Sequence, residues 1–239
     1  GIIVLNNDTP VGKPVKEYYN LENDIVFEID LTPNRIDGAS HIGVARDLAA
    51  FLNCHEQQVD LKWPDVDNFR VDKPDRPVDV KIADNDGCKR YSGITVSDIT
   101  VKASPQWLQR RLKAIGLQPI NNVVDITNFV LHETGHPLHA FDVDKIDGQQ
   151  VLIQTLPEKT PFKTLDGDTI DLSEKDLMIC NEKEGMCIAG VYGGYDSGVQ
   201  EGTTSVFIES AYFNPVYVRK TAHRHGYSTD ASYRFERGA

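Results

Sequence analysis

The sequence lacks several features that would assign a protein to a class at once. None of its apolar runs approaches the roughly 20 residues of a membrane-spanning helix, and no charged-then-apolar leader stands at its start, so we expect neither a membrane protein nor a secreted one. The GxSxG elbow, the P-loop and the dinucleotide fingerprint are also missing. Serine-nucleophile chemistry, nucleotide hydrolysis and dinucleotide binding therefore have no support from the sequence.

Cysteine is scarce, with four residues in the chain. No CxxC pair and no set of cysteine and histidine at zinc-binding spacing occurs, so a structural metal is not expected. Cys180 and Cys187 are close enough in sequence to face each other across a hairpin. We expect both to stay reduced, as thiols do in the cytoplasm.

Basic residues are outnumbered, with 25 lysines and arginines against 36 aspartates and glutamates, which gives a net charge of −11. A protein coated for nucleic-acid binding has the opposite sign, so any contact with nucleic acid is expected to be local. Two short basic segments qualify, residues 106–113 (QWLQRRLK) and 218–226 (VRKTAHRHG). For residues 106–113 the solvated face of a helix is the better explanation. For residues 218–226 a solvated helix face and a contact with nucleic acid both stay open.

Length and composition predict a globular protein of one large domain, or of a large and a small one. The chain has 239 residues, 40% of them apolar and 26% charged, which is an ordinary balance. It starts with glycine and stops abruptly after RFERGA, so we expect a piece of a longer protein. Residues 55–76 are polar and contain prolines, which predicts a linker between units at 1–70 and 75–239.

Hydrophobic periodicity and turn signals predict both helices and strands. Helices are expected at residues 40–52, 104–116, 123–134 and 214–226. Strands are expected at 26–30, 77–84, 91–101 and 204–213, hairpins at 164–172 and 176–194, and a tail at 227–239. Because helices and strands do not alternate strictly, the fold class is α+β: a mixed β core of hairpins and sheet layers with flanking helices, plus a small N-terminal helical or winged-type domain.

The strand at 206–211 places a carboxylate among apolar side chains. With a period of two, one face carries Val206, Ile208 and Ser210, and the other carries Phe207, Glu209 and Ala211. Burying Glu209 without a partner would cost several kcal/mol. The pattern alone leaves open whether Glu209 is exposed, paired with an arginine, or part of a site.

Two histidines, His136 and His139, follow the helix that Gly135 ends. A metal would need a further ligand, such as Asp142 or Asp144, and no HExxH-type spacing is present, so a metal site is disfavoured. Acid–base or hydrogen-bonding use of one histidine is better supported, and a structurally satisfied histidine is the commonest explanation.

Gly193 and Gly194 follow a strand and precede the segment DSGV at 196–199. Such a run can form a nest of backbone N–H groups that binds an anion or an oxyanion. A plain glycine turn is equally compatible with it. Composition and spacing alone thus give an α+β protein with a polar pocket of unnamed chemistry.

Five longer stretches together identify a family. They are EIDLTPNRIDGASHIGVARDLAA, PINNVVDITNFVLHETGHPLHAFD, GVYGGYDSGV, IESAYFNP and HRHGYSTDASYRFERG. In this order they closely resemble the β subunit of bacterial phenylalanyl-tRNA synthetase, over essentially the whole chain. The resemblance implies that residues 1–70 correspond to part of a B1 domain and residues 75–239 to a B3/B4 editing domain.

The resemblance also implies partners. The parent enzyme is a cytoplasmic tetramer of two α and two β subunits, in which the α subunit carries the ligase site and the full synthetase uses ATP and magnesium. For this fragment it implies no cofactor and no metal. The implied partners are the α subunit and the acceptor end of tRNA(Phe) with a wrongly attached tyrosine.

The function implied for the fragment is hydrolysis of that tyrosyl ester. A pocket shaped for phenylalanine rejects an added hydroxyl by only about 100-fold, whereas a second site that hydrogen-bonds the hydroxyl discriminates by roughly 10⁴. Such a site needs an acceptor on an apolar wall. Glu209, between Phe207 and Ala211, matches the family glutamate that recognises the tyrosine phenol.

Other family positions carry over one at a time. His139 matches the editing-site histidine, which handles the attacking water, and amides near Gly193 and Gly194 are expected to stabilise the oxyanion. The substrate-binding positions that match are Glu209, Thr127, Asn128, Gly193, Gly194, Thr229 and Ala231. The family usually has glutamine at His136, which therefore receives no catalytic role, and TPNRIDGAS departs from the usual TPNRPDCLS. The alternative function is a non-catalytic module that binds tRNA or assembles the synthetase.

Overall fold

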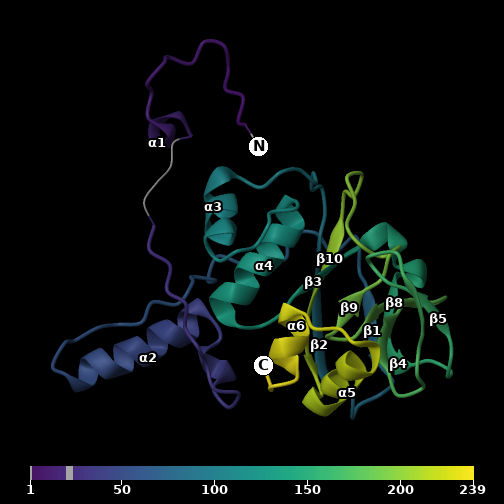
Figure 1. The fold of residues 1–239 in the computed structure, drawn as a ribbon. Helices are drawn as coiled ribbons and strands as arrows, with labels where there is room; N and C mark the ends of the chain where they lie inside the picture. The colour runs from purple at the N-terminus through teal and green to yellow at the C-terminus, as the bar shows by residue number, and fades with distance from the viewer. Residues whose placement is uncertain (1, 20–23) are drawn as a thin grey trace.

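The computed structural model describes residues 2–19 and 24–239 and has an α+β fold (Figure 1). Its strands form sheets of five, three and two members, and helices pack beside them. The fold class expected from the sequence is confirmed. In the described ranges, no helix has the length and apolar character needed to cross a membrane.

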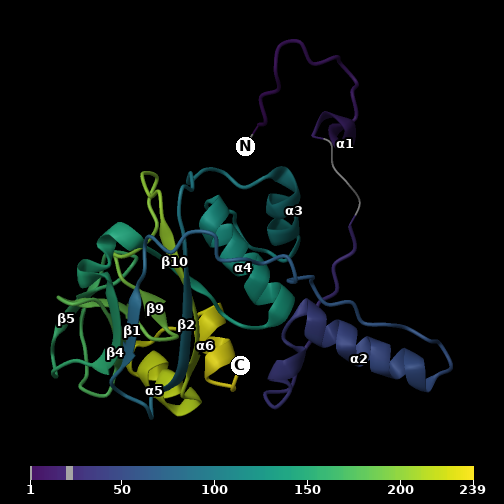
Figure 2. The same ribbon diagram turned by 180° about the vertical axis from the view of Figure 1, so that it is seen from behind.

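The N-terminal part contributes helical elements: α1 (Val15–Tyr18), the 3₁₀ helix η1 (Ile36–Gly38) and α2 (His41–Cys54). Figures 1 and 2 both show this part lying to one side of the sheets. Helix α2 begins where the sequence predicts, because the Ser40 hydroxyl accepts a hydrogen bond from the Gly43 N–H at 2.9 Å. The chain from 55 to 78 contains no helix or strand, as a linker would, while the division into 1–70 and 75–239 stays a prediction.

The strand expected at 26–30 does not form. Val26, Phe27 and Ile29 are exposed there. A strand needs a neighbour for its N–H and C=O groups, and none of the sheets in the described chain includes these residues. The alternating pattern was therefore not sufficient to produce a strand.

The five-stranded sheet has the order β1-β4-β7-β8-β9, with β1 and β4 parallel and the other pairs antiparallel. Its strands are β1 (Asp79–Ile82), β4 (Gln150–Thr155), β7 (Leu177–Cys180), β8 (Gly185–Ile188) and β9 (Tyr192–Gly193). Side chains such as Ile153, Met178 and Ile188 are fully buried in it. The β7–β8 pairing confirms the hairpin predicted at 176–194.

A small two-stranded sheet pairs β5 (Pro161–Lys163) with β6 (Thr169–Asp171). The turn between them contains Gly167 at φ +93, which a glycine adopts without steric cost. This confirms the turn and the second strand of the hairpin predicted at 164–172, whose first strand lies earlier than expected, at Pro161–Lys163. Two 3₁₀ helices, η2 (Val143–Lys145) and η3 (Asp147–Gln149), lead from β3 (His139–Asp142) to β4.

The three-stranded sheet positions the candidate site. Its order is β2-β10-β3, both pairs antiparallel, with β2 at Cys88–Val96 and β10 at Val206–Phe213. One face, with Phe141 and Phe207, belongs to the main hydrophobic core. The other face, with Ala140 and Val206, packs against Val123 in a smaller cluster.

Four helices accompany the sheets: α3 (Gln106–Ala114), α4 (Asn122–Thr134), α5 (Pro215–His225) and α6 (Asp230–Phe235). Helices α4 and α5 are followed, as predicted, by left-handed glycines, Gly135 and Gly226. Helix α3 differs at its start, because the Ser104 hydroxyl donates to the Asp125 carboxylate instead of capping the helix.

The tail expected at 227–239 is wrong, since it contains α6. The Thr229 hydroxyl accepts from the Ser232 N–H at 3.0 Å, and the Ser232 hydroxyl accepts from the Thr229 N–H at 2.9 Å. This reciprocal capping fixes the start of the helix. Phe235, 2% exposed, then anchors it in the main core.

Candidate functional site

Glu209 lies at the centre of the candidate site, on the middle strand β10. It pairs in register with Gly93 of β2 on one side and with His139 of β3 on the other. Its side chain is buried, and the Tyr91 hydroxyl donates a hydrogen bond to Oε2 at 2.6 Å. An exposed Glu209 and an arginine-paired one are therefore both wrong, because the partner is a tyrosine.

The surroundings change the protonation of this carboxyl group. Burial raises the pKa of Glu209 to about 7, although the hydrogen bond from Tyr91 opposes the rise. Burial and the nearby Glu209 carboxylate raise the pKa of Tyr91 well above its ordinary value. At neutral pH Tyr91 is therefore a neutral donor, while Glu209 is near the midpoint of its titration.

His139 begins β3 directly opposite Glu209. Its ring meets Phe141 edge to face at 4.5 Å between centroids. Nε2 is buried without a hydrogen-bond partner in the described chain, which is rare for a polar atom. Burial lowers the pKa of His139 to about 4, so the imidazole is neutral at physiological pH and has an acceptor nitrogen.

Gly193 lies against His139, and Gly194 against the neighbouring strand. A Cβ at Gly193 would stand 3.3 Å from His139 Cε1, and one at Gly194 would stand 2.5 Å from the Met186 carbonyl oxygen. The Gly194 N–H donates to that same oxygen at 2.9 Å. The expected oxyanion role is therefore wrong for the Gly194 amide, which is already bonded, and stays a prediction for Gly193.

Thr229 and Ala231 reach the same region from α6. The Thr229 hydroxyl donates to the Val191 carbonyl oxygen at 3.1 Å, two residues before Gly193. Ala231 packs, partly buried, against the main core. The structure thus brings the start of α6 to the glycine segment, while contact of these two side chains with a substrate stays a prediction.

Thr127 and Asn128 lie on α4. The Thr127 hydroxyl donates to the Val124 carbonyl oxygen at 2.8 Å, within its own helix. Val123, one turn earlier, packs on the sheet face opposite to Glu209. No hydrogen bond in the described residues joins Thr127 or Asn128 to His139, so their place in a pocket stays a prediction.

His136 has structural partners instead of catalytic ones. Burial lowers the pKa of His136, and the nearby backbone of Ala211 partly offsets this effect. The ring also meets Phe235 edge to face at 5.8 Å. Within residues 2–19 and 24–239, no three histidine, cysteine or acidic side chains gather as a metal site would require.

Sequence reasoning missed Tyr91, Gly93 and Cys187 as neighbours of Glu209. The alternation along 91–96 puts Tyr91 and Gly93 on one face, but only the register with β10 brings that face to Glu209. Cys187, buried on β8, has its pKa raised by burial and by the Glu209 carboxylate. It is a free thiol, like Cys180, as the sequence predicts.

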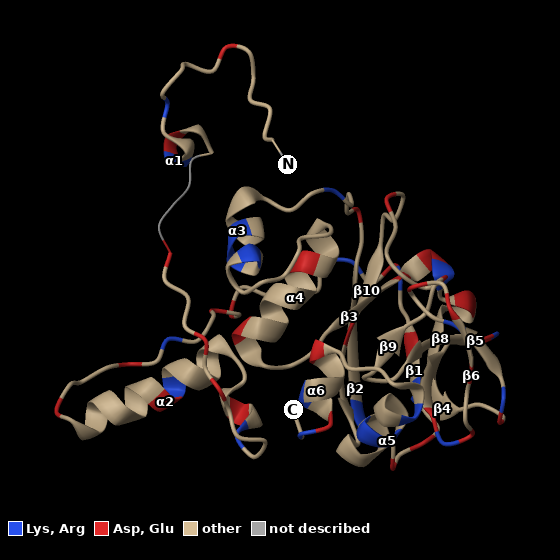
Figure 3. Ribbon diagram, in the orientation of Figure 1, with Lys and Arg blue, Asp and Glu red and all other residues tan. Residues whose placement is uncertain are grey.

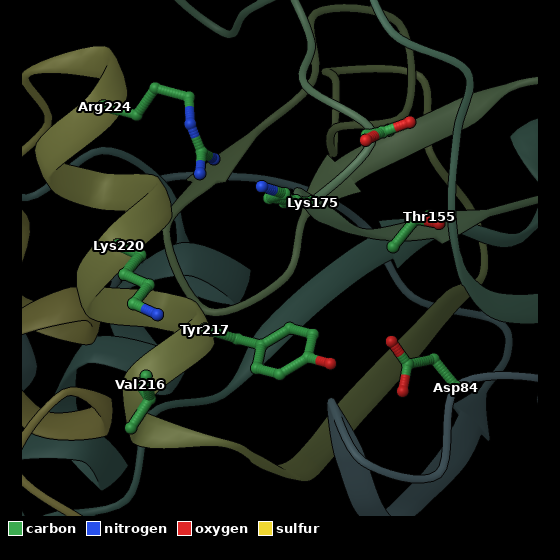
Figure 4. A pocket seen from close by; sticks show the side chains of 8 residues that line it. Asp84, Thr155, Lys175, Val216, Tyr217, Lys220 and Arg224 are labelled. Carbon is green, nitrogen blue, oxygen red and sulfur yellow. The ribbon is translucent and has the colours of Figure 1, made fainter.

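A hollow of about 420 Å³ lies along α5 (Figure 4). Lys220 and Arg224 project into it from the helix, and Asp84 lies on its other side. Arg224 also forms an ion pair with the buried Asp176. Figure 3 shows acidic and basic stretches interspersed over the fold. The basic segment 218–226 therefore contributes Lys220 and Arg224 to a hollow that acidic side chains such as Asp84 also line.

Comparison with known proteins gives the family. The B3/4 domain model matches residues 87–239. The chain belongs to the B3/4 domain family. That stretch contains all the candidate site residues named from the sequence, and the B3/4 domain also includes Tyr91, Gly93 and Cys187.

Two similar curated proteins are phenylalanine–tRNA ligase β subunits. The chain is 57% identical over 238 residues to the phenylalanine–tRNA ligase β subunit of Bacteroides thetaiotaomicron. It is 56% identical over 239 residues to that of Porphyromonas gingivalis. In both cases all of this chain is covered, and the chain spans 29% of the length of the relative.

A solved structure is also similar, an N-terminal fragment of the phenylalanyl-tRNA synthetase β subunit from Pyrococcus horikoshii. The identity is 16% and the TM-score 0.44, over 81% of this chain and 59% of the other. A likeness at this level carries no argument about the site.

Proposed function

We propose that this chain is part of a phenylalanine–tRNA ligase β subunit, and that its B3/4 domain hydrolyses tyrosine wrongly joined to tRNA(Phe). The observation that carries the proposal is the pairing of the buried Glu209 with the half-buried His139, opposite each other on adjacent strands. One residue of this pair is a hydrogen-bonding carboxyl group, and the other is a neutral imidazole with an unpartnered nitrogen. In this proposal the carboxyl group of Glu209 selects the amino acid, and the imidazole of His139 serves the hydrolysis.

Glu209 selects the amino acid. Its carboxyl group lies among Phe207, Ala211 and the rest of the main core, so the wall around it is apolar. A tyrosine phenol provides a hydrogen bond there, while a phenylalanine ring leaves the buried carboxyl group without that partner. A site of this kind discriminates by about 10⁴ or more.

His139 acts on the attacking water. Its neutral Nε2 accepts a hydrogen bond from the water and orients the oxygen toward the ester carbonyl. With its pKa lowered to about 4, it is a weak base, so the ribose hydroxyl of the terminal adenosine shares the proton transfer. Gly193 puts no side chain against the imidazole, since a Cβ there would stand 3.3 Å from His139 Cε1, and its backbone amide is the proposed donor to the oxyanion.

The whole ligase supplies the remaining parts in this proposal. The α subunit carries the ligase site and uses ATP with magnesium, and the assembled tetramer works in the cytoplasm. Other modules bind most of the tRNA, which fits the net charge of −11. Only the acceptor end, with its misattached tyrosine, enters the B3/4 domain.

The test is deacylation of tyrosyl-tRNA(Phe) and phenylalanyl-tRNA(Phe) by the assembled ligase. Glu209→Ala is expected to lose most of the roughly 10⁴-fold preference for tyrosine, while exposed Glu201→Ala keeps it. His139→Ala is expected to slow hydrolysis of tyrosyl-tRNA by about 10²-fold or more, with exposed His223→Ala as its control. Full tyrosine preference in Glu209→Ala would show that the assigned selection is wrong.

The alternative, a non-catalytic module for tRNA binding or assembly, predicts a different result. The unaltered ligase would then hydrolyse neither ester faster than buffer does. Arg224 and Lys220, in the hollow beside α5, are the basic residues such a module would use. Their replacement by alanine would weaken tRNA binding in that case and leave it unchanged in ours.

A further inference from the structure

We propose that Tyr91 is a positioning residue for Glu209: it occupies one carboxyl oxygen and leaves the other to receive the substrate's phenol. This inference rests on the proposed function and adds a residue to its selection step. Tyr91 itself touches no substrate in this arrangement. It acts through the carboxyl group whose orientation it fixes.

The sheet register brings Tyr91 to Glu209. Tyr91 pairs with Ala211, and Glu209 pairs with Gly93, so Tyr91 is a diagonal neighbour of Glu209 on the same face. Because Gly93 has no side chain, the Phe207 ring lies against β2 at the position directly opposite Glu209. The Tyr91 ring packs edge to face against Phe213, with ring centroids 6.5 Å apart. The Tyr91 hydroxyl lies 2.6 Å from Glu209 Oε2.

In this geometry the two carboxyl oxygens of Glu209 accept hydrogen bonds from different donors. A phenol donates one hydrogen bond, and an ionised carboxylate accepts at both oxygens. Tyr91 donates to Oε2, so Oε1 is the oxygen left for a second phenol, that of the substrate. A carboxyl group held from one side presents the other oxygen in a fixed direction, which is the condition for selecting one hydroxyl position.

The groups around Glu209 make Tyr91 its main stabilising partner. Cys88 and Tyr91 on β2, His139 on β3 and Cys187 on β8 are the titratable side chains that face it. At neutral pH none of them carries a positive charge, since the thiols and the phenol are protonated and the imidazole is neutral. Removing the Tyr91 hydroxyl therefore favours the protonated carboxyl group and moves its titration to higher pH.

The experiment compares Tyr91→Phe with the unaltered ligase in deacylation of both esters, from about pH 6 to about pH 8.5, around the pKa of Glu209. We expect the tyrosine preference at neutral pH to fall by roughly tenfold or more, the effect of one hydrogen bond to a charged group. We also expect it to recover as the pH rises. Tyr212→Phe, on an exposed position of β10, is the matched control and keeps the original profile. An unchanged profile in Tyr91→Phe would overturn the proposal.

A double-variant cycle separates positioning from a general structural role. If Tyr91 acts through the carboxylate, Tyr91→Phe costs much less preference when added to Glu209→Gln than when added to the unaltered ligase. An equal loss in both backgrounds overturns the proposal. If the Tyr91→Phe variant does not assemble into the ligase, the Glu209→Asp variant is measured instead. Its shorter side chain cannot reach both the Tyr91 hydroxyl and the substrate's phenol. Full tyrosine preference in Glu209→Asp would then overturn it.

The outcomes distinguish this inference from the function on which it rests. If Glu209→Ala keeps the tyrosine preference, the selection assigned to Glu209 is wrong and the role of Tyr91 is wrong with it. If Glu209→Ala loses the preference while Tyr91→Phe keeps it at every pH, only the positioning role is wrong.

Discussion

The two faces of β10 have the same alternation of side chains but different surroundings. Toward the main core, Phe207 and Ala211 are buried, and Glu209 lies between them bonded to Tyr91. Toward α4, Val206 is buried, but Ile208 is only partly so. The polar group is therefore on the more deeply buried face, where water is excluded and a single hydrogen bond has the largest effect on which ligand binds.

The largest difference between the two faces of β10 is expected when one large side chain is removed from each. Phe207→Ala is expected to lower the free energy of unfolding by about 3–5 kcal/mol, as buried aromatic deletions do. Ile208→Ala is expected to cost less than about 2 kcal/mol, because its side chain is partly in water. Urea denaturation of both variants measures this, and equal losses would contradict the difference between the faces.

The second test concerns pH. Glu209 has its pKa raised from 4.5 to about 7, so the folded state binds the proton more tightly than the unfolded state does. Its contribution to stability is present below pH 4.5 and is lost, by about 3 kcal/mol, as the pH rises through 7. His139, with its pKa lowered from 6.5 to about 4, contributes above pH 6.5 and loses that contribution as the pH falls through 4.

The two neighbours therefore oppose each other between pH 4.5 and 6.5. Glu209→Gln removes one of them, so its free energy of unfolding is expected to rise with pH across this window more steeply than that of the unaltered protein. Denaturation at several pH values measures the slope, with exposed Glu201→Gln as control. Equal slopes in the two proteins would show that Glu209 titrates normally.

The third test adds an atom instead of removing one. A Cβ at Gly93 would stand 2.0 Å from Phe207 Cζ, so Gly93→Ala forces the ring to move. We expect a loss of about 1–3 kcal/mol of stability, as in other overpacked cores, and a weaker tyrosine preference because the apolar wall shifts. Ser92→Ala, at the exposed neighbouring position, is the control. If Gly93→Ala were as stable as this control, the Phe207 ring would not lie against Gly93.

The smallest effect is expected next to Glu209 on the other face. Ser210→Ala should change the free energy of unfolding by no more than about 0.5 kcal/mol, because this side chain is partly exposed and away from the site. It should also leave deacylation unchanged. A large effect of Ser210→Ala would show that the α4 face takes part in the site.

Much of the fold was predictable because local chemistry decides it. Ser40 and Gly135 mark helix ends, and Gly167 marks a turn, through hydrogen bonds and dihedral angles of the chain itself. The absence of a strand at 26–30 was not predictable in this way. A strand needs a neighbouring strand to pair with, and the alternating pattern does not show whether one is present. Helix α6 was missed because its cap uses Ser232 where a glutamate would have signalled it.

Alternation along a strand is enough to place the Glu209 carboxylate on one face with Phe207 and Ala211, whatever the rest of the fold. The sequence also carried the family resemblance that singled out His139. The meeting of Glu209 with Tyr91 and His139 depends on the tertiary fold, since antiparallel register between distant strands is set by packing of whole sheets. The same packing bonds the Gly194 amide to Met186 and buries the carboxyl group, and both effects depend on neighbours that lie far away along the chain.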